Sequence, residues 1–368
     1  MENKKRKLKI VVVSTLWERT PPHLYGGTER VCSYITEELV KRGHDVTLFA
    51  TGDSKTSAKL ISSYPHALYR DKVPWTSFYD NLVSCANAME YAEDIRADIV
   101  HSHTPAYSLP FSHILNVPMV VTLHGNIGAD DLSLDRKRMF LAFKKTNFVS
   151  ISNSQRKIED LNYVATVYNG IPVKSYDFDR RGGDYLVWLG RITPKKGALE
   201  AIMVAKATEK KLFLLGKLDW AVEEDLKYFE KEIKPHLRKG KIEYLGEVDH
   251  AVKNRYLKGA KALLNPISWN EPFGLVPVEA NACGTPAVVF SRGSMPELID
   301  NKINGFLIKP GDIKGMIEFV RKIYQMPSAE YQKMRLACRK HVEENFTIEK
   351  MVDGYEEVYR KVIEDFKK

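Results

Sequence analysis

Cysteine is scarce in this sequence, and the cysteines that are present form no recognisable site. Cys32, Cys85, Cys283 and Cys338 are far apart, and no two of them form a C-x-x-C pair. Zinc sites and disulfide frameworks both depend on regularly spaced cysteines. We therefore expect reduced, mostly buried thiols and neither a zinc site nor a disulfide framework.

Long apolar runs are also missing. No stretch approaches the roughly 20 apolar residues that span a bilayer. The N-terminus, MENKKRKLK, lacks the apolar core of a signal peptide. These absences predict a cytoplasmic protein. Five of the first nine residues are Lys or Arg, in a chain of net charge +9, and such a cluster forms either a solvated tail or a peripheral contact with the anionic inner surface of a membrane.

Nucleic-acid recognition motifs are absent as well. The sequence contains no helix-turn-helix, zinc-finger or RNA-recognition signature, so its positive charge alone does not indicate a nucleic-acid partner.

The length and composition predict two folded domains. The chain has 368 residues, of which 44% are hydrophobic and 28% are charged. This is an ordinary globular composition, and a prior of about 150 residues per domain gives two domains.

Both halves of the sequence alternate short, β-branched apolar runs with helix-length amphipathic segments. This alternation predicts parallel sheets. The expected strands of the first half are 10–14, 45–50, 98–101, 118–123 and 147–151. Those of the second half are 185–189, 211–215, 242–245, 262–265, 286–290 and 305–308.

Turn formers and charges interrupt this pattern around residues 169–172 and 180–184. We therefore expect two Rossmann-like domains, 1–175 and 176–345, followed by a helix, 346–368, that packs across their junction. Two such α/β domains predict sheets that face a central cleft, where doubly wound sheets bind ligands at the carboxyl ends of their strands.

Two glutamates frame the most informative segment, 270–280. Glu271 follows a strand and a turn, and Glu279 falls within a helix that Pro277 is suited to begin near its first turn. The amides of Phe273, Gly274 and Leu275 would then point out of a helix N-terminus, which attracts phosphates and polar sugars. Alternatively, the segment is a surface loop followed by a solvated helix.

A cationic loop, 190–197, connects a strand to a helix at the start of the second half. Arg191 follows the strand and Lys196 precedes the helix, so both side chains can reach the carboxyl edge of the sheet. Arg presents a planar fork to phosphate oxygens and Lys a compact charge. We expect them to stabilise a departing diphosphate, whereas the neighbouring Lys195 is more typical of solvated surface.

Two weaker signals lie in the first half. Gly26 and Gly27 open the first helix and permit close approach of the backbone to a ligand. His124 ends a strand at the same sheet edge, where it can contact a ligand or serve a structural role.

Together these segments resemble the family-4 glycosyltransferases. The resemblance runs from the loop Tyr-Gly-Gly-Thr-Glu-Arg at 25–30, through Asp-Ile-Val-His-Ser-His at 98–103 and Leu-His-Gly at 123–125, to the segments around Arg191 and Lys196. It is strongest over 271–286, which matches the paired-glutamate motif of the family. One departure is Asn281, where the family more often has methionine.

The resemblance implies a retaining hexosyltransferase with the B-type fold of two Rossmann-like domains, with the acceptor on the N-terminal side and the nucleotide-sugar donor on the C-terminal side. Under this resemblance Glu271 binds the donor sugar and Glu279 the ribose. Arg191 and Lys196 hold the diphosphate, and Phe273, Gly274 and Leu275 offer amides to the sugar. His124 lies at the reaction centre, and Gly26 and Gly27 approach the donor.

No metal or other cofactor is expected. Asp177 and Asp179 have D-x-D spacing but fall in the predicted linker, and His101 and His103 have no evident third ligand. We expect UDP-hexose as donor, with GDP-mannose as the second choice, and an acceptor hydroxyl on a glycan, lipid or small molecule. The alternatives are a sugar-nucleotide epimerase, a phosphorylase or a non-catalytic sugar-nucleotide binder. The loop 246–250 is the candidate for base contacts, but its sequence does not identify the base.

Overall fold

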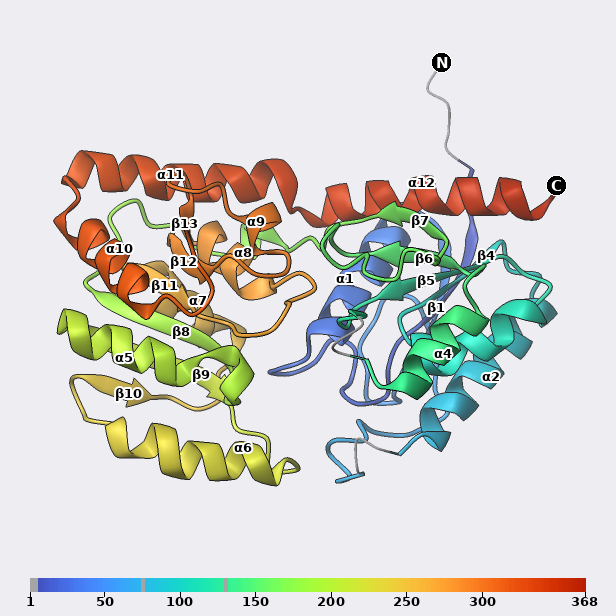
Figure 1. Ribbon diagram of the computed structural model, residues 1–368. Coiled ribbons are helices and arrows are strands. Elements are labelled where there is room, and N and C mark those ends of the chain that lie inside the picture. The colour runs from blue at the N-terminus through green and yellow to red at the C-terminus, as the bar shows by residue number, and fades with distance from the viewer. Residues whose placement is uncertain (1–5, 74–76, 129–131) are drawn as a thin grey trace, which may run out of the picture. The chain divides into compact units, whose positions relative to one another are not determined.

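The structure is a computed structural model that describes residues 6–73, 77–128 and 132–368. It divides the chain into two α/β units (Figure 1). Unit 1 comprises Met1–Gly170 and Ile348–Lys368, and unit 2 comprises Ile171–Thr347. The last helix of the chain is therefore part of the first unit.

Unit 1 is built on a seven-stranded sheet with the strand order β3-β2-β1-β4-β5-β6-β7, and all its neighbours pair in parallel. The sequence pattern did not predict β3 or β7, because each has only three or four residues and none of them is fully buried. The strands are β1 (Lys9–Val13), β2 (Asp45–Phe49), β3 (Lys59–Ile61), β4 (Ile99–Ser102), β5 (Met119–Leu123), β6 (Asn147–Ser150) and β7 (Tyr163–Thr166).

Helices cover both faces of this sheet (Figure 1). Val11 and Val13 of β1 share an apolar cluster with Ala88 of α2 and Phe140 of α4. The α1 and α12 helices pack against each other, and α12 also contacts β5. The helices are α1 (Gly27–Lys41), α2 (Tyr79–Asp94), α3 (Pro105–Ser108), α4 (Leu134–Ala142) and α12 (Ile348–Phe366).

Unit 2 repeats the design with a six-stranded parallel sheet in the order β10-β9-β8-β11-β12-β13. All six strands were predicted from short apolar runs, and the predicted class of two parallel-sheet Rossmann-like units is confirmed. The strands are β8 (Tyr185–Arg191), β9 (Lys211–Lys217), β10 (Ile242–Tyr244), β11 (Ala262–Asn265), β12 (Ala287–Phe290) and β13 (Gly305–Ile308).

The helices of unit 2 complete its apolar core. One cluster joins strand residues such as Trp188 and Leu214 to α5 and α10. The helices are α5 (Ala198–Thr208), α6 (Glu223–Tyr228), α7 (His250–Gly259), α8 (Leu275–Ala282), α9 (Met295–Leu298), α10 (Ile313–Gln325) and α11 (Ser328–Asn345).

A buried arginine on α11 fixes the ends of α7 and α8. The guanidinium of Arg335 is fully buried and donates to the carbonyls of Lys258 and Ala260 at the end of α7 and of Cys283 at the end of α8. It also donates to the Asp179 carbonyl at 2.6 Å. A cation is favourable at helix C-termini because the carbonyls there carry partial negative charge. Arg335 therefore holds together the two helices that carry Lys253 and Glu279.

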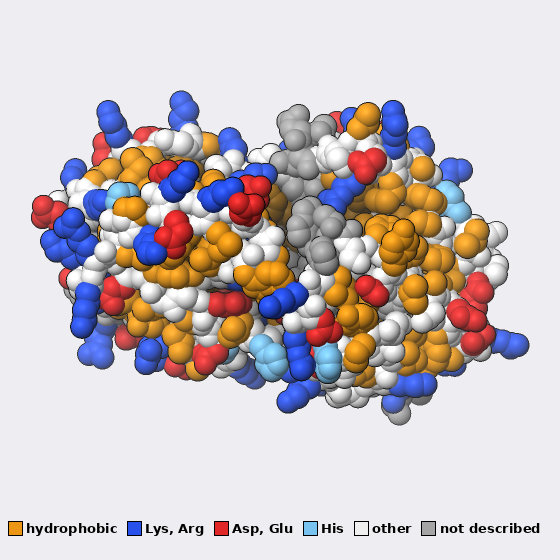
Figure 2. Space-filling view, turned by 90° about the horizontal axis from the view of Figure 1, so that it is seen from below, with side chains coloured by type: hydrophobic (Ala, Val, Ile, Leu, Met, Phe, Trp, Pro, Cys, Tyr) orange, Lys and Arg blue, Asp and Glu red, His pale blue; other side chains and the backbone are white. Residues whose placement is uncertain are grey.

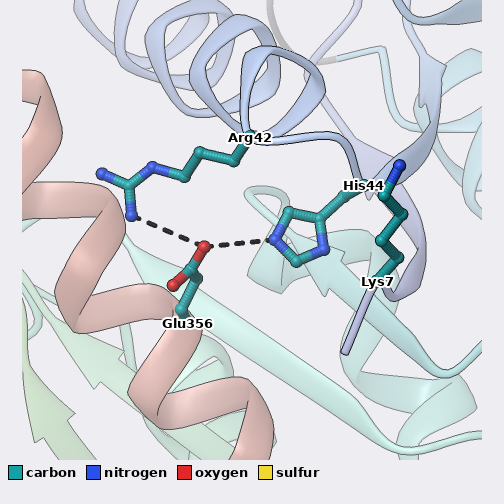
Figure 3. Close-up of a pocket in the computed structure, with 4 residues that line it drawn as sticks. All are labelled: Lys7, Arg42, His44 and Glu356. Atoms are coloured by element: carbon teal, nitrogen blue, oxygen red, sulfur yellow. Dashed lines mark hydrogen bonds and ion pairs between the residues drawn. The ribbon is translucent and has the colours of Figure 1, made fainter. Parts of the chain in front are cut away.

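A cavity of about 270 Å³ lies in unit 1, lined by Lys7, Arg42, His44 and Glu356 (Figure 3). The Leu8 amide donates to His44 Nδ1, and the other ring nitrogen lies 3.1 Å from Glu356 Oε1 on α12. Lys7 lies two residues before β1, and His44 lies one residue before β2. The cavity is therefore at the amino edge of the sheet, opposite the edge where the sequence places His124.

Among the described residues, no helix combines the length and apolar character needed to cross a membrane. Figure 2 shows hydrophobic side chains gathered between dispersed charged ones. Unit 1 exposes several large apolar side chains, including Tyr79 (78%) and Val83 (52%) of α2 and Leu134 (65%) of α4.

Candidate active site

In unit 2 the predicted cationic loop lies at the carboxyl edge of the sheet. Arg191 is the last residue of β8, and Lys196 ends the 3-10 turn before α5. Gly197, which follows, has φ +76°, and a Cβ there would lie 2.2 Å from the Pro266 carbonyl oxygen. Only glycine fits this close approach, so Gly197 fixes the position of Lys196 between strand and helix.

Lys196 and Glu271, predicted from separate segments, form a direct ion pair. Lys196 Nζ lies 2.5 Å from Glu271 Oε2, with side chains 20% and 15% exposed. Trp269 Nε1 donates to the same oxygen at 3.1 Å, and the Lys196 ammonium lies 4.8 Å from the Trp269 ring centroid. Charge-assisted bonds in such a partly shielded place are strong and directional. The arrangement fixes the Glu271 carboxylate and positions Lys196 beside it.

The backbone around Glu271 is held by two glycines. A Cβ at Gly293 would lie 2.5 Å from the Glu271 carbonyl oxygen, and that oxygen accepts from the Ser294 amide at 3.0 Å. Gly274 has φ +89° and would place a Cβ 2.6 Å from Met295 Cε. A larger residue at either position would displace the loop that carries Glu271.

Gly274 is the N-cap of α8, and Leu275 is the first residue of the helix. Within the described part of the chain, no side chain caps the N-terminus of α8 through a hydrogen bond from its N-cap residue. Phe273 is buried and its ring contacts Phe346, while its carbonyl accepts from the Ser294 hydroxyl. The predicted helix N-terminus is thus present, with Phe273, Gly274 and Leu275 in its first turn or immediately before it.

Glu279 lies within α8, as predicted, and is 4% exposed. Its Oε1 accepts from the Tyr176 hydroxyl at 2.8 Å and lies 2.5 Å from Lys253 Nζ. Sequence reasoning missed both partners. Lys253 on α7 has no motif around it, and Tyr176 belongs to the segment between the predicted domains, so only the fold brings them to Glu279.

The loop 246–250, the candidate for base contacts, makes contacts with neighbouring residues of unit 2. Asp249 caps α7 by accepting from the Val252 amide at 2.8 Å. His250 lies 3.1 Å from the Ser175 carbonyl oxygen, and its ring packs edge-on to Tyr176. The loop therefore borders the residues around Glu279.

Arg191 has an acidic neighbour that the sequence did not reveal. Its Nε lies 3.9 Å from Asp225 Oδ2 and has no hydrogen-bond partner within the described part of the chain. Burial raises the pKa of Asp225, and a hydrogen bond with Thr193 and the charge of Arg191 oppose that rise. The Arg191 side chain as a whole is 41% exposed, although its Nε is buried.

In unit 1 the two glycines differ in their roles. Gly26, the N-cap of α1, has φ 147°, and a Cβ there would lie 2.8 Å from Pro22. Gly27 does not need a positive φ, and a Cβ there would meet nothing within 4 Å. The backbone conformation at position 26 therefore requires glycine, whereas at position 27 glycine leaves open space at the first turn of α1.

His124 directly follows β5 and belongs to a cluster of three histidines. Its Nε2 lies 2.7 Å from Nδ1 of His103, which follows β4. The His103 ring lies 4.2 Å from that of His101, measured between centroids. His101 in turn contacts Thr122 and Tyr359 of α12, each at 2.7 Å. The histidines that the sequence offered as a doubtful metal pair thus form a buried hydrogen-bonded cluster.

The other possible metal motif is also engaged in local contacts. Asp177 accepts from Lys258 at 3.0 Å, and Asp179 accepts from the Arg181 amide at 2.7 Å. Across residues 6–73, 77–128 and 132–368, no group of three or more His, Cys, Asp or Glu side chains is placed to hold a metal ion.

Comparisons with known proteins match both units. Residues 25–174 match the family model Glycosyltransferase Family 4, and residues 179–343 match Glycosyl transferases group 1. Glycogen synthase of Mycobacterium tuberculosis is 25% identical, with 96% of this chain and 94% of that protein covered. N-acetyl-alpha-D-glucosaminyl L-malate synthase of Bacillus anthracis is 24% identical, with 93% and 96% covered.

Solved structures share the fold. Sucrose-phosphate synthase from Thermosynechococcus elongatus superposes with a TM-score of 0.80 at 18% identity, covering 98% of this chain and all of that one. Anabaena HepE in complex with UDP gives 0.76 at 17% identity, covering 96% and 100%. The chain is therefore a glycosyltransferase of the B-type fold. It belongs to glycosyltransferase family 4, and the predicted hexosyltransferase class is confirmed.

The buried histidines predict acid sensitivity of the fold. Burial lowers the pKa of His101 to about 3 and of His124 to about 4, and that of His103 well below its usual value. An unfolded histidine titrates near pH 6.5. Between that value and the folded pKa the unfolded chain binds more protons, so the free energy of unfolding falls as the pH falls.

We expect each such histidine to cost about 2 kcal/mol of stability at pH 5 relative to pH 7.5. Urea unfolding at the two pH values measures the loss. His124→Gln, which removes one titrating ring, should show a smaller loss than the unaltered chain. Equal stability of the unaltered chain at both pH values would contradict neutral burial of the cluster.

Proposed function

We propose that this glycosyltransferase moves a hexose from a nucleotide diphosphate sugar to an acceptor hydroxyl, with retention of anomeric configuration and without a metal ion. The observation that carries the proposal is the pairing of cations and carboxylates at the carboxyl edge of the unit 2 sheet. Lys196 and Glu271 form one pair and Lys253 and Glu279 another. Arg191, with a side chain that is 41% exposed, ends β8 at the same edge as Lys196.

The cations supply what a departing diphosphate needs. Arg191 and Lys196 would neutralise the developing negative charge, assisted by the α8 N-terminus with its partial positive charge. Glu271 would accept hydrogen bonds from sugar hydroxyls and Glu279 from the ribose. His124 would contact the transferred sugar. Metal ions often neutralise phosphates in other enzymes, and here the protein's own charges take that role.

Retention follows from front-side displacement. The acceptor oxygen forms a bond to the anomeric carbon on the face from which the diphosphate leaves, as the bond from that carbon to the phosphate oxygen breaks. The acceptor proton passes to a phosphate oxygen. Positioning and leaving-group stabilisation are the main sources of rate enhancement in this scheme.

UDP-hexose is the first choice of donor and GDP-mannose the second. Anabaena HepE, which shares the fold, is described with UDP-glucose bound. The acceptor is a glycan, a lipid or a small molecule, because the names of relatives point to products as different as glycogen and N-acetylglucosaminyl malate. No epimerase or phosphorylase is among the relatives named above, and the enzyme is preferred to a silent binder because both glutamates and both cations are present.

Contact with an anionic membrane stays a prediction. Residues 1–5 lie outside the described part of the chain. Within the described part, Arg6 bonds Asp98 at 2.6 Å and Lys9 donates to the Ile95 carbonyl at 2.8 Å. Two of the five N-terminal cations are therefore used within unit 1.

The activity itself can be tested with UDP-glucose in EDTA. At high enzyme concentration water serves as a slow acceptor, and ¹H NMR resolves the glucose released before it mutarotates. We expect turnover to persist in EDTA and the α-anomer to appear first. A β-anomer would refute front-side displacement. Activity lost in EDTA and restored by Mn²⁺ would refute the metal-independent mechanism, and GDP-mannose in parallel would identify the preferred donor.

The two glutamates should have separable effects. Glu271→Gln keeps the side-chain shape but removes the charge that orders the sugar, so it should mainly lower turnover while the nucleotide diphosphate still binds. Glu279→Gln should weaken the free nucleotide diphosphate. A hydrogen bond to a charged group is worth roughly 1.5 to 3 kcal/mol, or about ten to a hundred and fifty fold in affinity.

Calorimetry with UDP, beside steady-state rates with UDP-glucose, distinguishes these effects. Glu243→Gln is the matched control, because Glu243 is ion-paired with Lys211 in the same unit and lies outside the proposed site. The placement of the donor is wrong if Glu271→Gln abolishes UDP binding while Glu279→Gln leaves it intact.

A further inference from the structure

The contact between His103 and His124 is a hydrogen bond between two neutral rings. His103 Nδ1 and His124 Nε2 are 2.7 Å apart, and their ring centroids are 5.0 Å apart with planes inclined by 32°. Burial keeps both rings neutral at ordinary pH by lowering their pKa values. A neutral imidazole has one N–H and one bare nitrogen, so one ring must donate in this contact and the other must accept.

The second nitrogen of His103 decides between the two arrangements. His103 is 2% exposed, and its buried Nε2 has no hydrogen-bond partner within the described part of the chain. If His124 donated, His103 would carry its proton on Nε2, as a buried N–H without an acceptor. Among backbone groups, orphaned N–H donors are rarer than under-satisfied acceptors, and the same preference is expected of a buried ring N–H, which loses its hydrogen bond to water on burial. The favoured arrangement therefore places the His103 proton on Nδ1, where it is donated to His124.

The neighbouring residues hold His103 in this geometry. The His103 amide donates to the Val13 carbonyl at 2.9 Å, which ties the residue to the end of β1. On its other side the ring packs on His101, which Tyr359 and Thr122 anchor at 2.7 Å each. Thr122 also contacts the Tyr355 hydroxyl at 3.1 Å. These hydrogen bonds restrain His101, on which the His103 ring packs.

We infer that His103 is a positioning residue that holds His124 in the tautomer protonated at Nδ1, so that His124 acts as a neutral donor to an oxygen of the transferred sugar. The inference about the tautomer rests on the geometry of unit 1 alone. The role of the donated proton rests on the proposed function. A ring nitrogen whose partner is fixed in this way presents one defined hydrogen-bonding character to a ligand.

The tautomer can be measured directly by ¹⁵N NMR of imidazole-labelled protein, with His124→Gln identifying the His124 signals. The unaltered chain should show His124 protonated at Nδ1. His103→Asn keeps an N–H donor near the position of Nδ1 and should preserve that tautomer. His103→Phe keeps an aromatic ring but removes the bond, so proton occupancy should shift toward Nε2.

The rates test the functional part of the inference. With UDP-glucose, His103→Phe should lower kcat about tenfold while its affinity for UDP stays within about twofold, because one hydrogen bond is lost away from the nucleotide. His103→Asn should restore most of the rate. Tyr359→Phe is the matched control, because it removes a hydrogen bond to His101 but leaves the bond between His103 and His124 in place. In this variant the tautomer of His124 should be unchanged.

Protonation of His124 at Nε2 in the unaltered chain would overturn the inference, as would a His103→Phe variant with unchanged tautomer and rate. If the tautomers behave as expected but His103→Phe turns over normally, the positioning role fails while the geometry stands. Absence of turnover by the unaltered chain with any nucleotide sugar would instead count against the proposed function, because the NMR result does not depend on activity.

Discussion

The ion pair between Lys196 and Glu271 is the interaction on which the account of the donor site depends. Both side chains are only 15–20% exposed, so neither could lose its partner without leaving a poorly solvated charge. The pair therefore holds both side chains in place before a ligand arrives. A diphosphate is a stronger partner for an ammonium than one carboxylate, and its arrival would release Glu271 to accept hydrogen bonds from a sugar.

Other side chains of unit 2 are also held in place by charged partners. Lys253 and Tyr176 hold Glu279, and Arg335 fixes the ends of α7 and α8, the two helices that carry Lys253 and Glu279. Unit 1 uses neutral groups instead, because burial lowers the pKa of each histidine in its cluster. The two units thus position their functional side chains in different ways. Unit 2 uses ion pairs, and unit 1 uses hydrogen bonds between neutral histidines.

Most strands and several site residues could be predicted from the sequence, and those that could not lack a local sequence signal for physical reasons. Buried parallel strands such as β1 and β12 are continuous apolar runs and were found within one residue at each end, whereas β3 and β7 are short and half-buried and gave no signal. Glu271 and Lys196 stood out because each follows a strand in a recognisable motif. Their direct pairing did not, since 75 residues separate them. Lys253 and Asp225 carry no local pattern, and only the folded chain brings them to Glu279 and Arg191.

A crystal structure of the protein with UDP would test the central claim most directly. We predict that the Lys196 ammonium leaves its 2.5 Å contact with Glu271 and lies within hydrogen-bond distance of a β-phosphate oxygen. The Arg191 guanidinium should contact the diphosphate as well, and Glu279 should contact the ribose. An intact Lys196 to Glu271 pair, with the diphosphate bound away from both cations, would contradict the account.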